Sequence, residues 1–429
     1  MKPFLNRYLT TTGTAFVAIA LTMSSAPIPT WASWSSTEVV PVTIPSSTSN
    51  SNAESGPGFG LTAPSQSGPG TSGSSLSIYV PEQEVGPGIP NQNITDVPLL
   101  PPVPIENDFL NNSIIDPVVK VTDRYSYELM EADIYALQRI YGDKVHINII
   151  GQSHDGRSIY EVIVGNLAAP KHVLFQGAIH GREYMTPLLM MNQLEVALAN
   201  YDTGHYDNMA LSDMFQQVVL HFVPMSNPDG VTISQFGLSA VRTDFVRQSV
   251  LSSYTNDVAE GKTVLPLEQY LPYWKSNGAG VDLNHNFPAY WENISTPTAI
   301  SYANYKGTSP FSEPESQALA TLSTQRTWAA TVSYHSMGNI IYWDTENNQV
   351  AESSKALAES VSLVTGYQLN HSKGAGGYKD WMQTSNQYAP SITLEVGSVA
   401  CPMPVSEYDA IWQHNKSVWA RVMSYVIHH

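Results

Sequence analysis

Cysteine is nearly absent from the sequence, since Cys401 is the only one among 429 residues. No disulfide can therefore form within the chain, and a folded domain must be stabilised by its hydrophobic core. Roughly 310 residues of folded chain are enough to bury such a core. The lone thiol is followed by Pro402 and is interpreted as a packed residue rather than a nucleophile.

Positive charge is also scarce. Lys and Arg total 20 against 37 for Asp and Glu, which gives a formal net charge of −17. The basic residues form no cluster, whereas a protein that binds phosphate backbones needs clustered cations. The composition argues against nucleic acid as a partner.

Long apolar runs are missing, and the run from Ala15 to Met23 is too short to span a bilayer comfortably. It follows Lys2 and Arg7 and precedes a small residue, Ala32. This order of features predicts a secretory signal peptide over residues 1–32. We therefore expect an exported protein of the cell envelope or exterior, with no transmembrane span once the signal peptide is removed.

Residues 33–117 are rich in Ser, Gly, Pro, Thr and Asn and contain few large apolar side chains. Such a composition cannot bury a core and predicts a flexible or extended linker. Residues 118–429 are then expected to form one folded domain. No internal repeat is evident.

A strand-to-helix turn carries the first candidate site residues. The apolar segment His172–Ile179 suits a buried strand, and Leu188–Ala199 suits a helix. His180 and Glu183 lie between them and are of the residue types that zinc prefers. A His-x-x-Glu pattern also arises by chance, so it does not establish a site without support from the rest of the chain.

The start of this helix carries a second signal. Thr186 and Pro187 resemble an N-cap followed by a proline in the first helical position.

Five further segments follow in order and support the metal hypothesis. They are Val223-Pro224-Met225-Ser226-Asn227-Pro228-Asp229-Gly230, Gly280-Val281-Asp282-Leu283-Asn284-His285-Asn286-Phe287-Pro288, Pro310-Phe311-Ser312-Glu313-Pro314-Glu315, Ser333-Tyr334-His335-Ser336 and Thr393-Leu394-Glu395-Val396-Gly397. With the first turn, they resemble the zinc carboxypeptidase family of metallopeptidases. Within that family the resemblance is closest to the γ-D-glutamyl-L-diamino-acid endopeptidases, which cut peptidoglycan stem peptides. It extends from about Tyr125 to the C-terminus.

The resemblance implies a single three-layer α/β/α domain with a mixed, mostly parallel sheet. Alternating apolar segments along the chain agree with this fold class. Asn227-Pro228-Asp229-Gly230 is a turn signal. The predicted helices are 125–141, 188–199, 313–323, 352–364 and one long closing helix over 405–427, and the predicted strands are 145–150, 158–165, 172–179, 218–225, 331–335, 340–343 and 391–396.

The family resemblance also implies one zinc ion per chain, held by His180, Glu183 and His335. A hydrolytic zinc site needs three such ligands and one open position. The alternative for His335 is a buried strand histidine satisfied by a carbonyl group. Glu395, flanked by apolar neighbours, is the predicted general base for hydrolysis by a zinc-activated water.

A cation should stabilise the developing oxyanion. Family members place an Arg shortly before the Gly-Val-Asp motif, and Lys275 is the candidate here. The alternative is a solvated lysine.

The predicted substrate contacts depart from the family pattern. The carboxypeptidases of the family use Asn and Arg of an Asn-Arg-Asn motif to bind the terminal carboxylate of the substrate, but here the motif gives Asn284 and His285. A neutral imidazole binds carboxylate less well than a guanidinium. Simple C-terminal exopeptidase action is therefore in doubt, whereas Asn284 remains a candidate hydrogen-bond partner of the substrate.

The loop that ends in Gly376-Gly377-Tyr378-Lys379-Asp380-Trp381 resembles the family's specificity loop. Lys379 falls at the position that contacts the substrate side chain and would suit the extra carboxylate of diaminopimelate. A solvated lysine is the alternative. Tyr378 is a candidate donor to the scissile nitrogen.

The segment 234–272 shows no clear period and is expected to be either functional or disordered. The leading hypothesis is an exported zinc metallopeptidase, a monomer, that hydrolyses the γ-D-glutamyl-diaminopimelate bond of peptidoglycan stem peptides. One alternative is a zinc carboxypeptidase that acts on ordinary peptides. Another is a catalytically inactive module that binds the cell wall, although no predicted ligand or base is missing.

Overall fold

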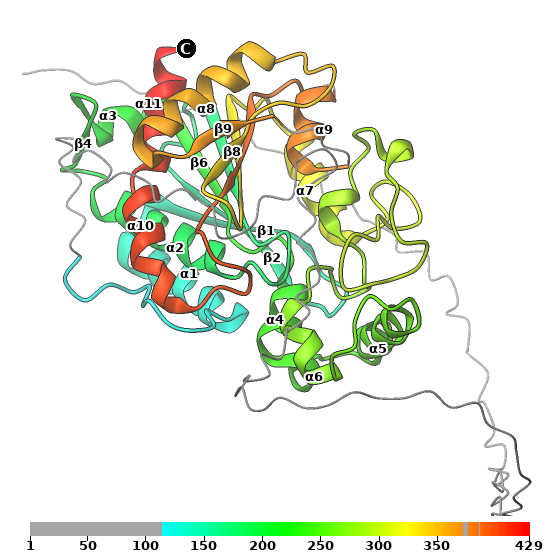
Figure 1. Cartoon of the computed structure of the whole chain (residues 1–429). Helices are drawn as coiled ribbons and strands as arrows, with labels where there is room; N and C mark the ends of the chain where they lie inside the picture. The colour runs from blue at the N-terminus through cyan, green and yellow to red at the C-terminus, as the bar shows by residue number, and fades with distance from the viewer. Residues whose placement is uncertain (1–113, 372–375, 386) are drawn as a thin grey trace, which may run out of the picture. The chain divides into compact units, whose positions relative to one another are not determined.

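The computed structural model describes residues 114–371, 376–385 and 387–429 (Figure 1). The predicted signal peptide and residues 33–113 of the predicted linker lie outside the described residues, so the domain limits stay predictions. Within the described part of the chain, no helix combines the length and the apolar character that a membrane span requires.

An eight-stranded mixed sheet forms the centre of the domain, in the order β1-β2-β6-β3-β7-β10-β8-β9. The four neighbours β6, β3, β7 and β10 run parallel to one another. On one side β2 is antiparallel to both β6 and β1, and on the other β8 is antiparallel to β10 and parallel to β9. The strands are β1 (Val145–Gln152), β2 (Ser158–Val164), β3 (Lys171–Gln176), β6 (Val218–Val223), β7 (Ala330–His335), β8 (Ile340–Tyr342), β9 (Gln368–Asn370) and β10 (Ser391–Glu395), while β4 (His205–Tyr206) and β5 (Met209–Ala210) form a separate small hairpin.

Helices connect most of these strands. The α-helices are α1 (Tyr127–Tyr141), α2 (Met185–Ala199), α3 (Leu211–Phe215), α4 (Pro228–Phe236), α5 (Asp244–Ala259), α6 (Leu267–Tyr270), α7 (Pro314–Thr324), α8 (Ala351–Thr365), α9 (Tyr378–Thr384), α10 (Tyr408–Asn415) and α11 (Val418–His428). The short 3-10 helices are η2 (Gly142–Lys144), η3 (Gly237–Ala240), η4 (Leu271–Tyr273), η5 (Leu283–His285), η6 (Trp291–Asn293) and η7 (Val405–Glu407).

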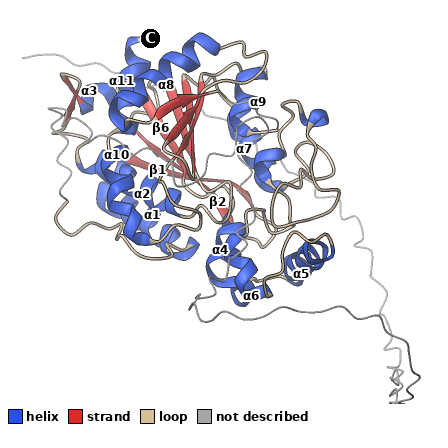
Figure 2. Ribbon diagram, in the orientation of Figure 1, coloured by secondary structure: helices blue, strands red, loops and turns tan. Residues whose placement is uncertain are grey.

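The helices cover both faces of the sheet, so the predicted three-layer α/β/α fold is confirmed (Figure 2). Side chains alternate between the faces along each strand, as the period of two requires. On β3, Val173 and Phe175 pack into the larger core with α1, α2, α8, α10 and α11, whereas Leu174 packs into the smaller core with α7 and α9. The central parallel strands are thus buried from both sides.

The start of α2 differs from the predicted one. The helix begins at Met185 and its N-cap is Tyr184, so the N-cap assignment of Thr186 is wrong. The Thr186 hydroxyl instead accepts a hydrogen bond from the Ala178 amide at 2.9 Å and donates one to the Glu183 carbonyl at 2.9 Å. Thr186 therefore fixes the turn between β3 and α2 from inside the first helical turn.

The predicted long closing helix is also wrong, because it is divided into α10 and α11 at Asn415. The amide of Gln193 on α2 donates to the Asn415 carbonyl at 2.6 Å, and the Asn415 amide donates to the Tyr367 hydroxyl at 2.8 Å. These contacts with distant parts of the chain hold Asn415 at the end of α10. Similarly, Asn227 caps α4 by accepting from the Gly230 amide, so the predicted turn there begins a helix.

Segment 234–272 is ordered, which rules out the disordered alternative. Its helices α5 and α6 pack with Trp274 around a small core of their own. Buried Asp257 on α5 accepts hydrogen bonds from the Ser301 hydroxyl at 2.7 Å, the Tyr302 amide at 2.9 Å and the Tyr270 hydroxyl at 2.6 Å. The segment is therefore attached to the loop around residue 301.

A buried ion cluster joins this segment to the sheet. The guanidinium of Arg157, which is 1% exposed, lies 2.6 Å from an Asp155 carboxylate oxygen and 2.9 Å from an Asp229 carboxylate oxygen. Arg157 also donates to the Ala240 carbonyl at 2.8 Å, and Asp155 accepts from the Thr243 amide at 2.7 Å. One guanidinium thus connects the turn before β2, the start of α4 and the end of η3, and Asp155 extends the cluster to the start of α5.

We expect Arg157→Met to lower the free energy of unfolding by about 3 to 5 kcal/mol, because two buried carboxylates would lose their cation. Urea or thermal unfolding measures the change. Arg139→Met, at an exposed position near the end of α1, is the matched control and should stay within about 0.5 kcal/mol of the parent. Equal stability of the two variants would contradict the assigned role of Arg157.

Candidate metal centre

Three candidate metal ligands meet at one edge of the sheet. His180 and Glu183 lie on the turn between β3 and α2, and His335 is the last residue of β7. Because β3 and β7 are parallel neighbours, their carboxyl ends lie at the same edge. Gly181 allows the turn to pass closely over α4, since a Cβ atom there would lie 2.4 Å from the Gly230 carbonyl oxygen.

The ligand atoms converge on one point. One oxygen of Glu183 lies 2.7 Å from Nδ1 of His180, and the other lies 3.2 Å from Nδ1 of His335. The two Nδ1 atoms are themselves 3.2 Å apart. All three side chains are buried, and their candidate ligand atoms lie within 4.8 Å of one another. Although burial alone would favour the protonated form, the imidazole of His180, then that of His335, holds the pKa of Glu183 well below its usual value.

This geometry fits a zinc ion. Two facing imidazole nitrogens and a carboxylate form the His₂Glu set of a hydrolytic zinc site, which leaves the fourth position for water or substrate. The opposite nitrogen of His180, Nε2, lies 3.2 Å from a carboxylate oxygen of Asp282. The two atoms lie within ion-pair distance, but they are not well aligned for a hydrogen bond. A proton held on Nε2 by Asp282 leaves the Nδ1 lone pair free for the metal.

Asp282 was not among the site residues predicted from the sequence, although it belongs to the Gly280-Val281-Asp282 motif that was recognised there. Its side chain is fully buried, and its second oxygen lies 3.0 Å from Nζ of Lys275. Burial opposes the charged form, but Lys275 and then His180 hold the pKa of Asp282 well below its usual value. Asp282 therefore connects a candidate ligand to the candidate oxyanion residue.

Glu395 ends β10, the strand next to β7, and pairs with His335 in the ladder. Burial, reinforced by the charge of Glu183 and opposed by that of His335, raises the pKa of Glu395 to about 7. A carboxyl group with a pKa near neutrality can both accept and donate a proton, which is what a general base in amide hydrolysis must do. Its position next to a candidate ligand agrees with the predicted role.

Lys275 lies near the candidate metal ligands because its backbone runs beside Gly181. Its carbonyl group accepts a hydrogen bond from the Gly181 amide at 3.0 Å, and its Nζ lies 3.2 Å from Oδ1 of Asn304. The side chain is only 13% exposed, which does not agree with the solvated alternative. Its amide and that of Ser276 both donate to the Tyr302 carbonyl at 2.9 Å.

His285 also lies near Asp282. Its Nδ1 is 4.0 Å from the nearer Asp282 oxygen and 3.4 Å from the Asn304 carbonyl oxygen. Burial lowers the pKa of His285, and the charge of Lys275 lowers it further, although Asp282 opposes the shift. The imidazole is therefore neutral near pH 7. Neighbouring Asn284 uses its side-chain oxygen to accept from the Tyr378 amide at 3.2 Å.

Tyr378 and Lys379 do not join the other candidates. The Tyr378 ring is fully buried against Phe287, and its hydroxyl lies 2.7 Å from the Ser323 hydroxyl. Lys379 is 5% exposed, pairs with the Asp380 carboxylate and donates to the Asp344 carbonyl at 2.8 Å. Contrary to the sequence-based predictions, neither side chain is free to contact a substrate in this structure. The solvated alternative for Lys379 is equally unsupported.

A second group of possible ligands consists of His154, Glu313 and Glu315. His154 lies 2.9 Å from Glu313, and the Asn277 amide donates to both carboxylates, at 2.8 and 3.0 Å. Burial, then the charge of Asp229, raises the pKa of Glu315 to about 7, so protonation can remove its charge. We interpret this group as a structural hydrogen-bond network.

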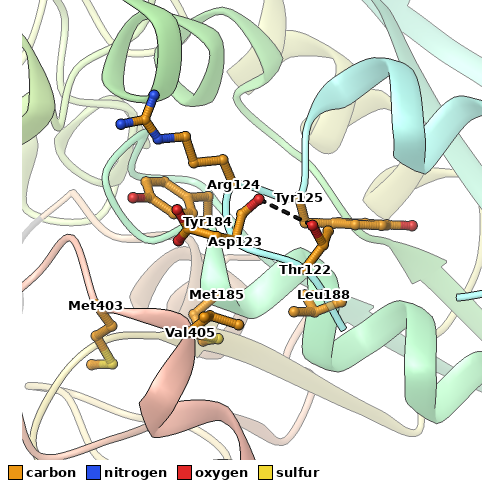
Figure 3. Close-up of a pocket in the computed structure, with 9 residues that line it drawn as sticks. All are labelled: Thr122, Asp123, Arg124, Tyr125, Tyr184, Met185, Leu188, Met403 and Val405. Atoms are coloured by element: carbon orange, nitrogen blue, oxygen red, sulfur yellow. Dashed lines mark hydrogen bonds between the residues drawn. The ribbon is translucent and has the colours of Figure 1, made fainter. Parts of the chain in front are cut away.

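A small pocket lies beside the start of α2 and is separate from the ligands (Figure 3). Tyr184 and Met185, which follow Glu183, form part of its wall, while Arg124 donates to the Gln235 carbonyl at 3.1 Å. None of the three candidate ligands lines it. The nearby thiol of Cys401 is buried, and burial raises its pKa, which agrees with a packed cysteine rather than a nucleophile.

Comparisons with known proteins agree with this geometry. The family model for zinc carboxypeptidase matches residues 130–417. The gamma-D-glutamyl-L-diamino acid endopeptidase 1 of Lysinibacillus sphaericus is 32% identical over 302 residues, which cover 69% of this chain and 71% of that protein. Thrombin activatable fibrinolysis inhibitor shares the fold with a TM-score of 0.57 at 18% identity, over 75% of this chain and 79% of its own. Carboxypeptidase A from Helicoverpa armigera does so with a TM-score of 0.51 at 20% identity, over 71% and 72% of the two chains.

We expect one equivalent of zinc per chain, and we expect His180→Ala to lose it, because the two remaining ligands cannot hold the ion tightly. His154→Ala, in the second group, is the matched control and should keep one equivalent. Metal analysis after dialysis distinguishes the two groups. If the His180→Ala variant kept its zinc and the His154→Ala variant lost it, the second group would be the zinc site.

Proposed function

The chain belongs to the zinc carboxypeptidase family, and on that premise we propose that it cuts peptidoglycan stem peptides at the bond between γ-D-glutamate and the diamino acid. It is a zinc metallopeptidase, a hydrolase of peptide bonds. The observation that carries the substrate proposal is its 32% identity to a protein named as an endopeptidase for this bond. The signal-like residues 1–32 support export to the place where this substrate lies.

His180, Glu183 and His335 are the proposed zinc ligands. Zinc, when bound, supplies a Lewis acid that polarises the scissile carbonyl group and acidifies water. Asp282 keeps His180 in the tautomer that offers Nδ1. The two imidazoles and the carboxylate are held by strand ends and a helix start, so little reorganisation is needed when substrate binds.

Glu395 takes a proton from the attacking water and passes it to the leaving nitrogen. Its raised pKa, about 7, suits both transfers. Lys275 provides a fixed positive charge for the developing oxyanion, and Asp282 holds it in place at 3.0 Å. As a lysine it acts as a point charge rather than through a bidentate fork.

The presence of a histidine at position 285 favours the proposal of cleavage within a stem peptide over that of removal of a C-terminal residue. A neutral imidazole does not neutralise a terminal carboxylate, and burial lowers the pKa of His285. The competing proposal, a zinc carboxypeptidase for ordinary peptides, requires a strong carboxylate contact that a neutral imidazole does not provide. Hydrogen bonding of substrate by Asn284 would require its amide nitrogen, because the oxygen accepts from Tyr378.

We expect Glu395→Gln to keep the zinc and the fold but to lose roughly a hundredfold in kcat, because an amide cannot accept the proton of water. Glu352→Gln, an exposed position in the first turn of α8, is the control and should keep full activity. Release of diaminopimelate-containing fragments from purified stem peptides, followed by mass spectrometry, measures the loss. Near-normal turnover by the Glu395→Gln variant would move the base elsewhere, and no turnover by the parent protein would favour a binding module.

A hydrolysis panel tests the substrate class. We expect cleavage of the γ-D-glutamyl-diaminopimelate bond in tripeptide and tetrapeptide stems alike, and poor release of C-terminal residues from plain peptides. His285→Arg should raise that release roughly tenfold, because a guanidinium binds carboxylate through two charge-assisted hydrogen bonds. Efficient trimming of plain peptides by the parent protein, with the stems intact, would establish the carboxypeptidase alternative.

A further inference from the structure

A row of polar side chains crosses the sheet on the face that α7 covers. Nδ1 of His221 on β6 lies 2.7 Å from a carboxylate oxygen of Glu161 on β2. The other ring nitrogen of His221, Nε2, lies 2.9 Å from Nδ1 of His172, the second residue of β3. His221 and Glu161 are both buried, whereas His172 is partly exposed. We call Glu161, His221 and His172 the histidine relay.

The partners in the histidine relay determine where its hydrogen atoms lie. A carboxylate only accepts hydrogen bonds, so the contact with Glu161 places a proton on Nδ1 of His221. Nε2 of His221 then carries the lone pair and accepts from Nδ1 of His172. The same nitrogen lies 3.3 Å from Nη1 of Arg326, and a guanidinium offers only donors. His221 is therefore neutral in the intact relay.

The charges around the relay are balanced only while both histidines are neutral. Although burial alone would raise it, the hydrogen bonds from His221 and Asn148 hold the pKa of Glu161 below its usual value. Glu161 and Arg326 thus supply one charge of each sign. Of the ionisable groups in the described part of the chain, His221, Arg326 and Glu161 are those that act on His172. One more proton would leave a net positive charge in a largely buried row, which is costly.

The balance makes the stability of the fold depend on pH. Burial, then the charges of His221 and Arg326, lower the pKa of His172 from 6.5 to about 4, and Glu161 opposes the shift. Burial also lowers the pKa of His221. The unfolded chain therefore binds these protons more tightly than the folded chain does. The contribution of the relay to stability is present above pH 6.5 and is lost as the pH falls from 6.5 to about 4.

The relay lies where two strands that carry candidate zinc ligands begin. The carbonyl group of His172 accepts a hydrogen bond at 2.8 Å from the amide of Ala329, which directly precedes β7. Arg326 belongs to the same turn between α7 and β7. Strand β3 leads to His180, and β7 ends at His335. A positive charge in the relay would thus weaken the packing at the amino ends of the strands whose carboxyl ends form the candidate metal centre.

We propose that the histidine relay is an acid-sensitive switch, which holds β2, β6, β3 and the turn before β7 together while it is neutral and loosens them when it is protonated. The relay lies at the end of β3 opposite to His180, so the switch acts on the fold and is independent of the substrate. Mild acid would therefore destabilise the domain through a group of residues that takes no part in the chemistry.

The test measures urea unfolding of the whole chain at pH 7 and at pH 5. The double variant His172→Gln/His221→Gln keeps a donor and an acceptor at each position, but its amides take up no proton. Between the two pH values, we expect the unfolding equilibrium constant of the parent to rise roughly fivefold more than that of the double variant. His205→Gln, at an exposed position of β4, is the matched control and should respond to pH as the parent does. A double variant that loses stability in acid as steeply as the parent would refute the switch.

A second measurement keeps the proposal testable if the double variant does not fold. NMR of labelled histidine side chains follows the protonation of His172 in the parent, and we expect a titration midpoint near 4. Arg326→Gln should raise this midpoint, because the variant removes a positive charge beside the relay. A midpoint near 6.5 in the folded parent would show that the relay accepts a proton without cost, and it would overturn the proposal.

Discussion

The rest of the candidate metal centre depends on the contacts of one buried carboxylate, that of Asp282. Its two oxygens face the His180 imidazole and the Lys275 ammonium group, and they also accept hydrogen bonds from the amides of Asn284 and Asn304, both at 3.1 Å. A fully buried charge is stable only when it is matched and hydrogen-bonded in this way. One residue therefore fixes the tautomer of a candidate ligand, the position of a cation and the start of the loop that carries His285. Replacing it would disturb all three together.

Parallel strand order explains how residues far apart in sequence meet around this carboxylate. The strands β3, β7 and β10 are neighbours, and their carboxyl ends carry His180 and Glu183, His335 and Glu395. Ligands of α/β proteins commonly bind at this edge of the sheet. The sheet is covered on both faces, so the strand ends are held rigidly, as a preorganised site requires.

Much of this was predictable from the sequence, because the signals are local. The turn around His180 and the strand ends at His335 and Glu395 were recognised from short motifs. The three-layer class was implied by the family resemblance that those motifs carry, and the apolar periodicity agreed with it. Features set by distant contacts were not predictable. Gln193 donates a hydrogen bond to the Asn415 carbonyl where the closing helix is divided, and Tyr378 is buried against Phe287. The role of Asp282 was missed for the same reason, since its contacts with His180 and Lys275 appear only in three dimensions.

The attachment of segment 234–272 has a consequence for how the protein can vary. Asp257 on α5 holds Ser301 and the Tyr302 amide, and the Tyr302 carbonyl in turn holds the backbone of Lys275. The position of Lys275 thus depends on α5, a helix that contains no candidate catalytic residue. Helix α5 should therefore vary little in length among related proteins. A relative that shortened or lost this helix would need another contact to hold the loop around residue 301, because otherwise Lys275 would be displaced.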